Sequence, residues 1–141
     1  MFLFDTDVIT NIFKPTPSQY LIERLKNLPR KDQFVSTITI AEIVYGAMKS
    51  IRPKYHLFNL KNLILPTVTI VSFNSEAAFY CGKIRAELEK QGIPISFADL
   101  QIASIAISHE LTLITGNTKH FQRISTLLFF PKYFLKLFFA E

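Results

Sequence analysis

Short apolar segments alternate with segments of helical periodicity along the 141 residues, and this alternation restricts the fold more than any other feature. Strands are expected at residues 2–4, 34–35, 67–73 and 111–115. Each is short and apolar on both faces, which is typical of a parallel sheet that helices cover on both sides. Right-handed crossovers then connect the strands. The pattern predicts an α/β fold of three layers with a mainly parallel central sheet.

Segments of helical spacing connect the expected strands. The apolar residues of "SQYLIERLKNL" (18–28) gather on one side, and helical spacing follows Val35 within "QFVSTITIAEIVYGAMKS". A long helix is expected from Asn74 or Ser75 to Gln91, because these residues cap helices and Gly92 accepts the left-handed conformation that ends them. Further helices are expected up to residue 13 and over residues 55–64 and 96–110.

The composition fits one globular domain that folds by burial, since 49% of the residues are hydrophobic and 19% are charged. Cys81, the single cysteine, has helical spacing with apolar neighbours and is expected in the core. The first apolar run breaks at Asp5, which does not fit a secretory signal, so a cytoplasmic protein is expected. The net charge of +5 favours a polyanionic or acidic partner.

Polar side chains with metal-binding or catalytic chemistry lie near the ends of the expected strands. Asp5 ends the first strand, Glu42 lies in the first turn after the second, and Asn117 follows the fourth. Asp99 opens the helix that precedes the fourth strand. In a parallel α/β sheet the working crevice lies beyond the carboxyl ends of the strands, so these four residues are the candidate catalytic residues.

Helix capping is the competing explanation for several of these acids. "TIAE" (39–42) and "SFAD" (96–99) both match the Ser/Thr-x-x-acid capping box, and Asp7 can cap the first helix. Asp5 has no such role in the sequence, and a carboxylate behind an apolar strand needs a cation or hydrogen-bond donors. Several anions at one edge repel one another unless a divalent cation joins them. The pattern therefore favours an oxygen-ligand site for Mg²⁺ or Mn²⁺.

Three segments of the chain resemble PIN-domain ribonucleases, and among them the VapC-type toxins of bacterial toxin–antitoxin pairs. They are "FLFDTDVI" (2–9), "STITIAEIVYGAMKS" (36–50) and "GIPISFADLQIASIAISHELTLITGNTKHFQRI" (92–124). The resemblance covers residues 1–126 and implies a three-layer α/β/α PIN-like fold. It assigns Asp5, Glu42 and Asp99 to the acidic triad of the family and Asn117 to a further site position. Asp5 and Asp99 are expected to be the direct metal ligands.

The resemblance also implies a function. We expect a Mg²⁺- or Mn²⁺-dependent endoribonuclease that acts as the toxin of a type II pair and hydrolyses RNA with a metal-activated water. Its expected partners are RNA, a VapB-type antitoxin and a second copy of the chain in a homodimer. Basic residues beside aromatic ones suit RNA, so Lys49, Arg52 and Lys54 are the candidate RNA-binding residues.

Two features depart from the family pattern. Family members often carry another carboxylate at Asn117 or His120, and both residues are uncharged here, which predicts weaker metal binding or a single ion. Residues 127–141 do not resemble the terminal strand of the family. They are expected to form an apolar extension, packed on the domain or a partner, with Phe130, Phe134, Leu137 and Phe138 on one side of a short helix. Pro131, Lys132 and Lys136 interrupt this segment, so no membrane span is expected.

Two alternatives remain open at the level of sequence. "DTDVIT" approximates the D-x-D start of haloacid-dehalogenase-type phosphatases, in which Asp5 would be the nucleophile and Asp7 the general acid. That chemistry also needs a later lysine and a close acidic pair, and only Asp99 is acidic in its region. The other alternative is a catalytically impaired PIN fold that binds RNA or an antitoxin without turnover.

Overall fold

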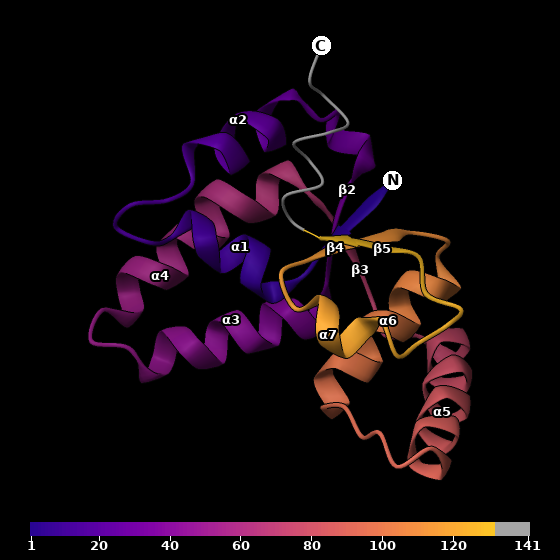
Figure 1. Cartoon of the computed structure of the whole chain (residues 1–141). Coiled ribbons are helices and arrows are strands. Elements are labelled where there is room, and N and C mark those ends of the chain that lie inside the picture. The colour runs from indigo at the N-terminus through magenta and orange to yellow at the C-terminus, as the bar shows by residue number, and fades with distance from the viewer. Residues whose placement is uncertain (132–141) are drawn as a thin grey trace.

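The computed structural model describes residues 1–131, which form a five-stranded sheet with helices on both faces (Figure 1). Neighbouring strands of this sheet pair in parallel, and the strand order is β3-β2-β1-β4-β5. The strands are β1 (Phe2–Phe4), β2 (Gln33–Ser36), β3 (Thr69–Val71), β4 (Thr112–Thr115) and β5 (Phe129–Pro131). The expected parallel sheet is confirmed.

The direction of chain progression reverses at β1, the central strand. Leu3 pairs with Phe34 of β2 on one side and with Leu113 of β4 on the other. The chain adds β2 and β3 on the first side, and then crosses to add β4 and β5 on the second. Ligand sites of open α/β sheets lie beyond the strand ends at such a reversal. A ligand site is therefore expected at the carboxyl ends of β1 and β4.

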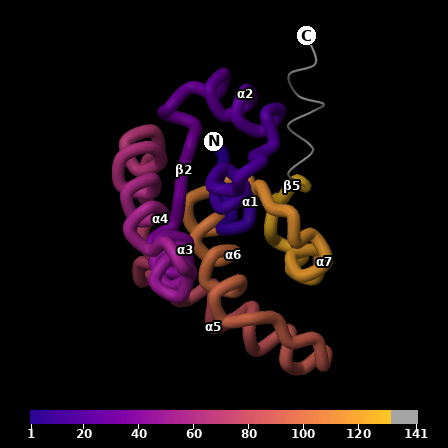
Figure 2. Tube along the Cα trace, turned by 90° about the vertical axis from the view of Figure 1, so that its left-hand side faces the viewer, coloured from indigo at the N-terminus to yellow at the C-terminus, as the bar shows by residue number. Residues whose placement is uncertain are grey.

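Helices connect the strands and cover the sheet. They are α1 (Thr6–Ile12), α2 (Gln19–Asn27), α3 (Thr37–Lys49), α4 (Pro53–Asn59), α5 (Ser75–Lys90), α6 (Phe97–Ser108) and α7 (Thr118–Phe121). Short 3₁₀ turns lie at Arg30–Asp32 and Leu65–Thr67, and a π-helical turn at Leu60–Ile64. Figure 2 shows α3 and α4 on one side of α1, with α7 and β5 on the other. Within residues 1–131 no helix combines the length and apolarity that a bilayer crossing requires.

Two apolar clusters hold the layers together, one on each face of the sheet. Successive side chains of a strand point to opposite faces. Leu3 and Leu113 therefore pack with α5 and α6, while Phe4 and Ile114 pack with α1 and α2. All four side chains are completely buried. Burial on both faces explains why these strands are uniformly apolar, and it confirms the α/β/α architecture.

Local signals in the sequence fix several helix ends. The Asn74 side chain accepts a hydrogen bond of 2.9 Å from the backbone N–H of Ala77, so Asn74 caps α5. Gly92 follows α5 with a φ of 68°, the left-handed conformation expected where this helix ends. Cys81 is buried on the inner face of the same helix, as expected.

The described part of the C-terminal segment packs on the domain, which is one of the two placements expected for residues 127–141. Leu127 is buried in the cluster with α5 and α6, and Phe129–Pro131 extends the sheet as β5, paired in parallel with β4. Phe130 therefore lies in a strand and not on the expected helix. The remaining residues of that expected helix, Phe134, Leu137 and Phe138, lie outside the described residues. Residues 129–131 form a strand although their sequence does not resemble the terminal strand of the family. Pairing with β4 at the edge of the sheet uses backbone hydrogen bonds, so it does not depend on that resemblance.

Candidate active site at the carboxyl ends of β1 and β4

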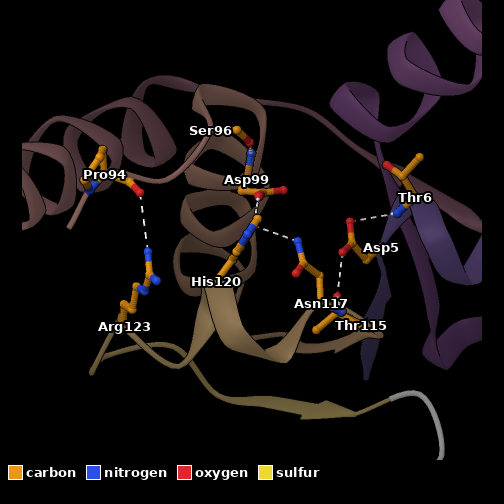
Figure 3. A network of polar contacts seen from close by, with 9 residues as sticks. All are labelled: Asp5, Thr6, Pro94, Ser96, Asp99, Thr115, Asn117, His120 and Arg123. Atoms are coloured by element: carbon orange, nitrogen blue, oxygen red, sulfur yellow. Dashed lines mark hydrogen bonds and ion pairs between the residues drawn. The ribbon is translucent and has the colours of Figure 1, made fainter.

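Asp5 lies where β1 ends and α1 begins, and only 5% of its surface is exposed. Its Oδ1 accepts a hydrogen bond of 2.7 Å from the backbone N–H of Thr6, and its Oδ2 accepts one of 2.6 Å from the Thr115 hydroxyl (Figure 3). Asp5 is also the N-cap of α1. The expectation that Asp5 has no capping role was therefore wrong, because the helix begins immediately after the strand.

Burial raises the pKa of the Asp5 carboxyl to about 6, since desolvation disfavours the charged form. The hydrogen bonds from Thr115 and Thr6 oppose this effect, and repulsion by Asp7 and Asp99 adds to it. Three carboxylates are thus close enough to influence one another at this edge of the sheet.

Glu42 lies in the second turn of α3 and reaches the site through Thr6. Ser36 is the N-cap of α3 and accepts a hydrogen bond of 3.0 Å from the Thr39 N–H, so the expected capping box from Thr39 to Glu42 was wrong. The Glu42 carboxylate instead accepts a hydrogen bond from the Thr6 hydroxyl. Because the Thr6 N–H is bonded to Asp5, Thr6 connects the two acids.

Asp99 is held at the start of α6, where the Ser96 side chain caps the helix by accepting a hydrogen bond of 3.1 Å from the Asp99 N–H. This half of the second expected capping box is confirmed. The Asp99 side chain turns toward α7, where Oδ2 lies 2.9 Å from Nδ1 of His120 (Figure 3). The same His120 nitrogen lies 2.7 Å from the side-chain amide nitrogen of Asn117.

One network of close polar contacts joins all four candidate catalytic residues. The backbone N–H of Asn117 donates to the Thr115 hydroxyl at 2.9 Å, and Thr115 donates to Asp5. The contacts run in the order Glu42, Thr6, Asp5, Thr115, Asn117, His120 and Asp99. Nδ1 of His120 lies within hydrogen-bond distance of both Asn117 and Asp99, but it donates to Asp99 when protonated and accepts from Asn117 when not, so it bonds to one of them at a time. Residues from β1, α3, α6 and the end of β4 thus meet at one edge of the sheet.

Sequence reasoning missed three members of this network: Thr6, Thr115 as an Asp5 donor, and His120. Thr115 ends β4 and Thr6 follows Asp5 at the start of α1, and this position near a strand end is the only signal that they carry. Asp7 does not cap the first helix; its Oδ2 accepts a hydrogen bond of 2.9 Å from the backbone N–H of Gly116. This contact fastens the first turn of α1 to the end of β4.

The candidate site offers oxygen ligands of the type that a hard divalent cation prefers. However, the acids are not arranged around one common position. Asp5 and Asp99 offer carboxylate oxygens, which Mg²⁺ and Mn²⁺ prefer. Burial raises the pKa of Asp5, and repulsion by Asp7 and Asp99 adds to the rise. Among residues 1–131, no three His, Cys, Asp or Glu side chains are grouped so that they could hold a metal ion. The expected convergence of Asp5, Glu42 and Asp99 on one position is therefore absent from this part of the chain, where hydroxyl groups and His120 connect them instead.

The candidate RNA-binding residues lie apart from this network, at the end of α3 and the start of α4. Lys49 is seven residues beyond Glu42 on the same helix, or about 10 Å along its axis. The Lys49 ammonium lies 5.0 Å from the Tyr45 ring centre, and the Arg52 guanidinium lies 4.9 Å from that of Tyr55. A role of Lys49, Arg52 and Lys54 in RNA binding stays a prediction.

Comparison with known proteins identifies the family. The PIN domain family matches residues 2–127. The chain belongs to the PIN-domain family. Ribonuclease VapC2 of Rickettsia felis is 33% identical over 129 residues, which are 91% of this chain and 95% of that protein. The tRNA(fMet)-specific endonuclease VapC of Shigella flexneri is 32% identical over 89% of this chain and 93% of its own length.

Solved structures of related proteins share the whole fold of this PIN domain. VapBC2 from Rickettsia felis, bound to a DNA fragment from its promoter, matches with a TM-score of 0.85 and 30% identity over 92% of this chain and 97% of the other. FitAcB from Neisseria gonorrhoeae matches with a TM-score of 0.84 and 30% identity over 94% of this chain and 99% of the other. The resemblance to VapC-type PIN domains is confirmed, and with it the three-layer fold.

Proposed function

We propose that this VapC-type PIN domain is a metal-dependent endoribonuclease and the toxin of a type II toxin–antitoxin pair. The observation that carries the proposal is the network that joins Asp5, Glu42, Asp99 and Asn117 where β1 and β4 end. Relatives that share about a third of the sequence are named as ribonucleases, which supports the same chemistry. The substrate proposed is RNA, without assignment to one RNA species.

Asp5 and Asp99 are the residues that would hold Mg²⁺ or Mn²⁺, through their carboxylate oxygens. Such an ion, when bound, polarises the scissile phosphate and lowers the pKa of a coordinated water. The hydrogen bonds from Thr115 and Thr6 fix the orientation of Asp5. Glu42, which accepts a hydrogen bond from Thr6, would accept a proton from the attacking water at a carboxylate oxygen. His120 contacts Asp99 from the opposite side, and the Asn117 side chain lies against the same nitrogen of His120.

The sequence left two alternatives open, a phosphatase and a catalytically impaired PIN fold, and different observations bear on each. The PIN-domain match contradicts the phosphatase hypothesis. In addition, Asp7, which that hypothesis requires as a general acid, accepts a hydrogen bond from the Gly116 backbone. The impaired-nuclease hypothesis has one specific observation in its favour: His120 occupies Asp99 Oδ2, an oxygen that a metal would use.

The proposed partners follow from the related structures. Several of these are described as VapBC assemblies, and one as a toxin–antitoxin complex from Klebsiella pneumoniae. We propose that this chain likewise binds a VapB-type antitoxin and forms homodimers within that assembly. Co-expression with a VapB-type protein, followed by co-purification and measurement of the mass of the complex, tests this part.

An RNA cleavage assay tests the activity. The purified chain should cut single-stranded RNA with Mg²⁺ or Mn²⁺ and stop when EDTA is added. Asp5→Asn and Asp99→Asn should each reduce kcat by at least about 100-fold, the usual cost of removing charge stabilisation in an active site. Glu89→Gln is the matched control, because Glu89 is an exposed carboxylate on α5 that pairs with Arg85. Equal activity of Asp99→Asn and Glu89→Gln would contradict the proposal.

The impaired-nuclease alternative predicts a different result in the same assay. The wild type would then bind RNA in gel-shift experiments without cutting it under any divalent cation. Asp5→Asn and Asp99→Asn would leave that binding unchanged, because neither acid would participate in turnover. Cleavage that is lost in the Asp99→Asn variant excludes this alternative.

A further inference from the structure

A groove of about 390 Å³ opens beside the network, between α1, α3 and α4. Glu42, Gly46 and Ala47 line it from α3. Phe13 and Lys14, which follow α1, and His56 of α4 contribute further walls. Glu42 belongs both to the groove and to the network, through its hydrogen bond from Thr6. The groove therefore adjoins the candidate active site at Glu42.

Aromatic rings lead from this groove to the basic segment at residues 49–54. The rings of Phe13 and His56 lie edge to face, with centres 6.5 Å apart and planes at 72°. On its other side His56 meets Tyr55, with ring centres 5.3 Å apart and planes at 75°. The Arg52 guanidinium lies over the Tyr55 ring. The surface between Glu42 and the basic segment thus carries aromatic rings packed edge to face.

The lining combines aromatic rings with positive charge. Lys14 is a cation on the wall, and Glu42 is the acid that the groove shares with the network. Single-stranded RNA offers the complementary features, because its bases stack on aromatic side chains while Lys and Arg bind its phosphates. A volume of about 390 Å³ is within the range of small-molecule sites, about 300–1,000 Å³. A flat base with its sugar is a ligand of suitable chemistry and size.

We propose that this groove binds a nucleobase of the RNA substrate adjacent to the scissile phosphate. The base packs against the rings of Phe13 and His56, Lys14 contacts a neighbouring phosphate, and the RNA strand continues toward Arg52. This inference rests on the proposed function, since Glu42 connects the groove to the reacting position. It adds a specificity-determining site to the acidic network.

Gly46 allows the groove to be filled without disturbing the fold. A Cβ atom added at Gly46 meets no other atom within 4 Å, so a larger side chain has room to project into the groove. Leucine also has a higher helix propensity than glycine, which favours α3. Gly82 on α5 supplies the matched control, because it is an exposed helical glycine with equally open space at its Cβ position.

Binding in EDTA separates the groove from catalysis. A short fluorescent single-stranded oligoribonucleotide is titrated with wild type, Gly46→Leu and Gly82→Leu, and its anisotropy is measured. Gly46→Leu should weaken binding by about 5- to 150-fold, which corresponds to one base–aromatic stack, while Gly82→Leu should bind as the wild type does. His56→Ala should weaken binding similarly, and His56→Phe should restore it because the ring is retained.

Abasic nucleotides then locate the base. Abasic substitution at one position next to the mapped cleavage site should weaken binding to the wild type, and should have no further effect on Gly46→Leu. Gly46→Leu that binds RNA as tightly as Gly82→Leu would overturn the groove proposal while leaving the nuclease proposal intact. Gly46→Leu that loses only the VapB-type antitoxin would assign the groove to a peptide and also overturn it. A wild type that neither binds nor cuts RNA would overturn both proposals.

Discussion

The Thr115 hydroxyl donates a hydrogen bond of 2.6 Å to the Asp5 carboxylate, across 110 positions of sequence. Both side chains are buried, and each lies at the carboxyl end of a strand or directly after it. Because β1 and β4 pair in parallel, the sheet register brings the two residues together. The orientation of the most buried acid in the site is therefore a property of the sheet.

The pH dependence of stability should report the burial of Asp5. The pKa of this carboxyl is raised from 3.8 to about 6 in the folded protein, so the folded state retains a proton that the unfolded state has released. Stability without metal should therefore fall as the pH rises from about 4 to about 6, and then level off. The shift in the pKa of Asp5 corresponds to a loss of roughly 3 kcal/mol in the free energy of unfolding across this pH range.

Asp5→Asn isolates this effect, because the amide keeps one acceptor for the Thr6 N–H and carries no charge. Urea unfolding in EDTA at a series of pH values should show the variant gaining stability relative to wild type as the pH rises through this window. Glu87→Gln, an exposed change on α5, should follow the wild type. A difference between Asp5→Asn and wild type that does not vary with pH would contradict the proposed burial cost.

Mn²⁺ should stabilise the folded protein through Asp99. A ligand that binds only the native state adds about 2.7 kcal/mol at a free concentration of 100 times its Kd. Thermal unfolding with and without Mn²⁺ should show a rise in Tm for the wild type and no rise for Asp99→Asn. The Mn²⁺-induced shifts in Tm are compared rather than the Tm values themselves. Asp99 lies in the first turn of α6, so its replacement can change Tm without any metal. An equal shift in both proteins would exclude Asp99 as a ligand.

Thr6 should act as a positioning residue for Glu42. Thr6→Val keeps the shape of the side chain but removes the hydroxyl that donates to Glu42. We expect kcat to fall by at least about tenfold, part of the 10²–10⁴ that a positioned acid–base group contributes, with KM unchanged. Thr6→Ser should restore kcat, and Thr69→Val on the exposed face of β3 should have no effect. A normal kcat for Thr6→Val would remove Thr6 from the proposed site.

Asp7 should tolerate replacement by asparagine. Asp7→Asn retains an oxygen that can accept the hydrogen bond from the Gly116 N–H, and it removes a charge that raises the pKa of Asp5. We expect kcat/KM close to wild type and a lower Asp5 pKa, measured from the pH dependence of unfolding. Asp7→Ala, which loses the bond to Gly116, should be less stable. Inactive Asp7→Asn would instead assign Asp7 a direct part in the chemistry.

His120→Glu should increase the affinity for metal. It places a carboxylate beside Asp99, at a position where family members often carry an acid. Without metal, the new charge should lower the free energy of unfolding by like-charge repulsion. Calorimetric titration with Mn²⁺ should show tighter binding than in the wild type, and His120→Gln should not reproduce it. Unchanged affinity in His120→Glu would show that His120 does not limit metal binding.

Much of the fold was predictable because its signals are local. Uniformly apolar strands such as residues 2–4 indicated burial on both faces, and the structure confirms it. Asn74 and Gly92 marked the two ends of α5, since a cap and a left-handed residue act on their immediate neighbours. The four candidate catalytic residues were found because strand ends in a parallel sheet lie at one edge.

Other features were not predictable, for equally physical reasons. Thr39 matched a capping box, but Ser36 caps α3 because the helix begins three residues earlier than that motif implies. Phe130 was expected on a short helix, but residues 129–131 pair with β4 as an edge strand. His120 had no recognisable partner in the sequence, since Asp99 is 21 positions away and belongs to another helix.

The sequence by itself determined the order of the first four strands and the helices between them and placed acids where strands end, because hydrophobic period and helix caps are encoded over a few neighbouring residues. Only the tertiary structure decided which side chains meet: Thr115 with Asp5, Thr6 with Glu42, and His120 with Asp99. The physical reason is that strand register and helix packing bring together atoms distant in sequence, and hydrogen bonds require positions accurate to a few tenths of an ångström.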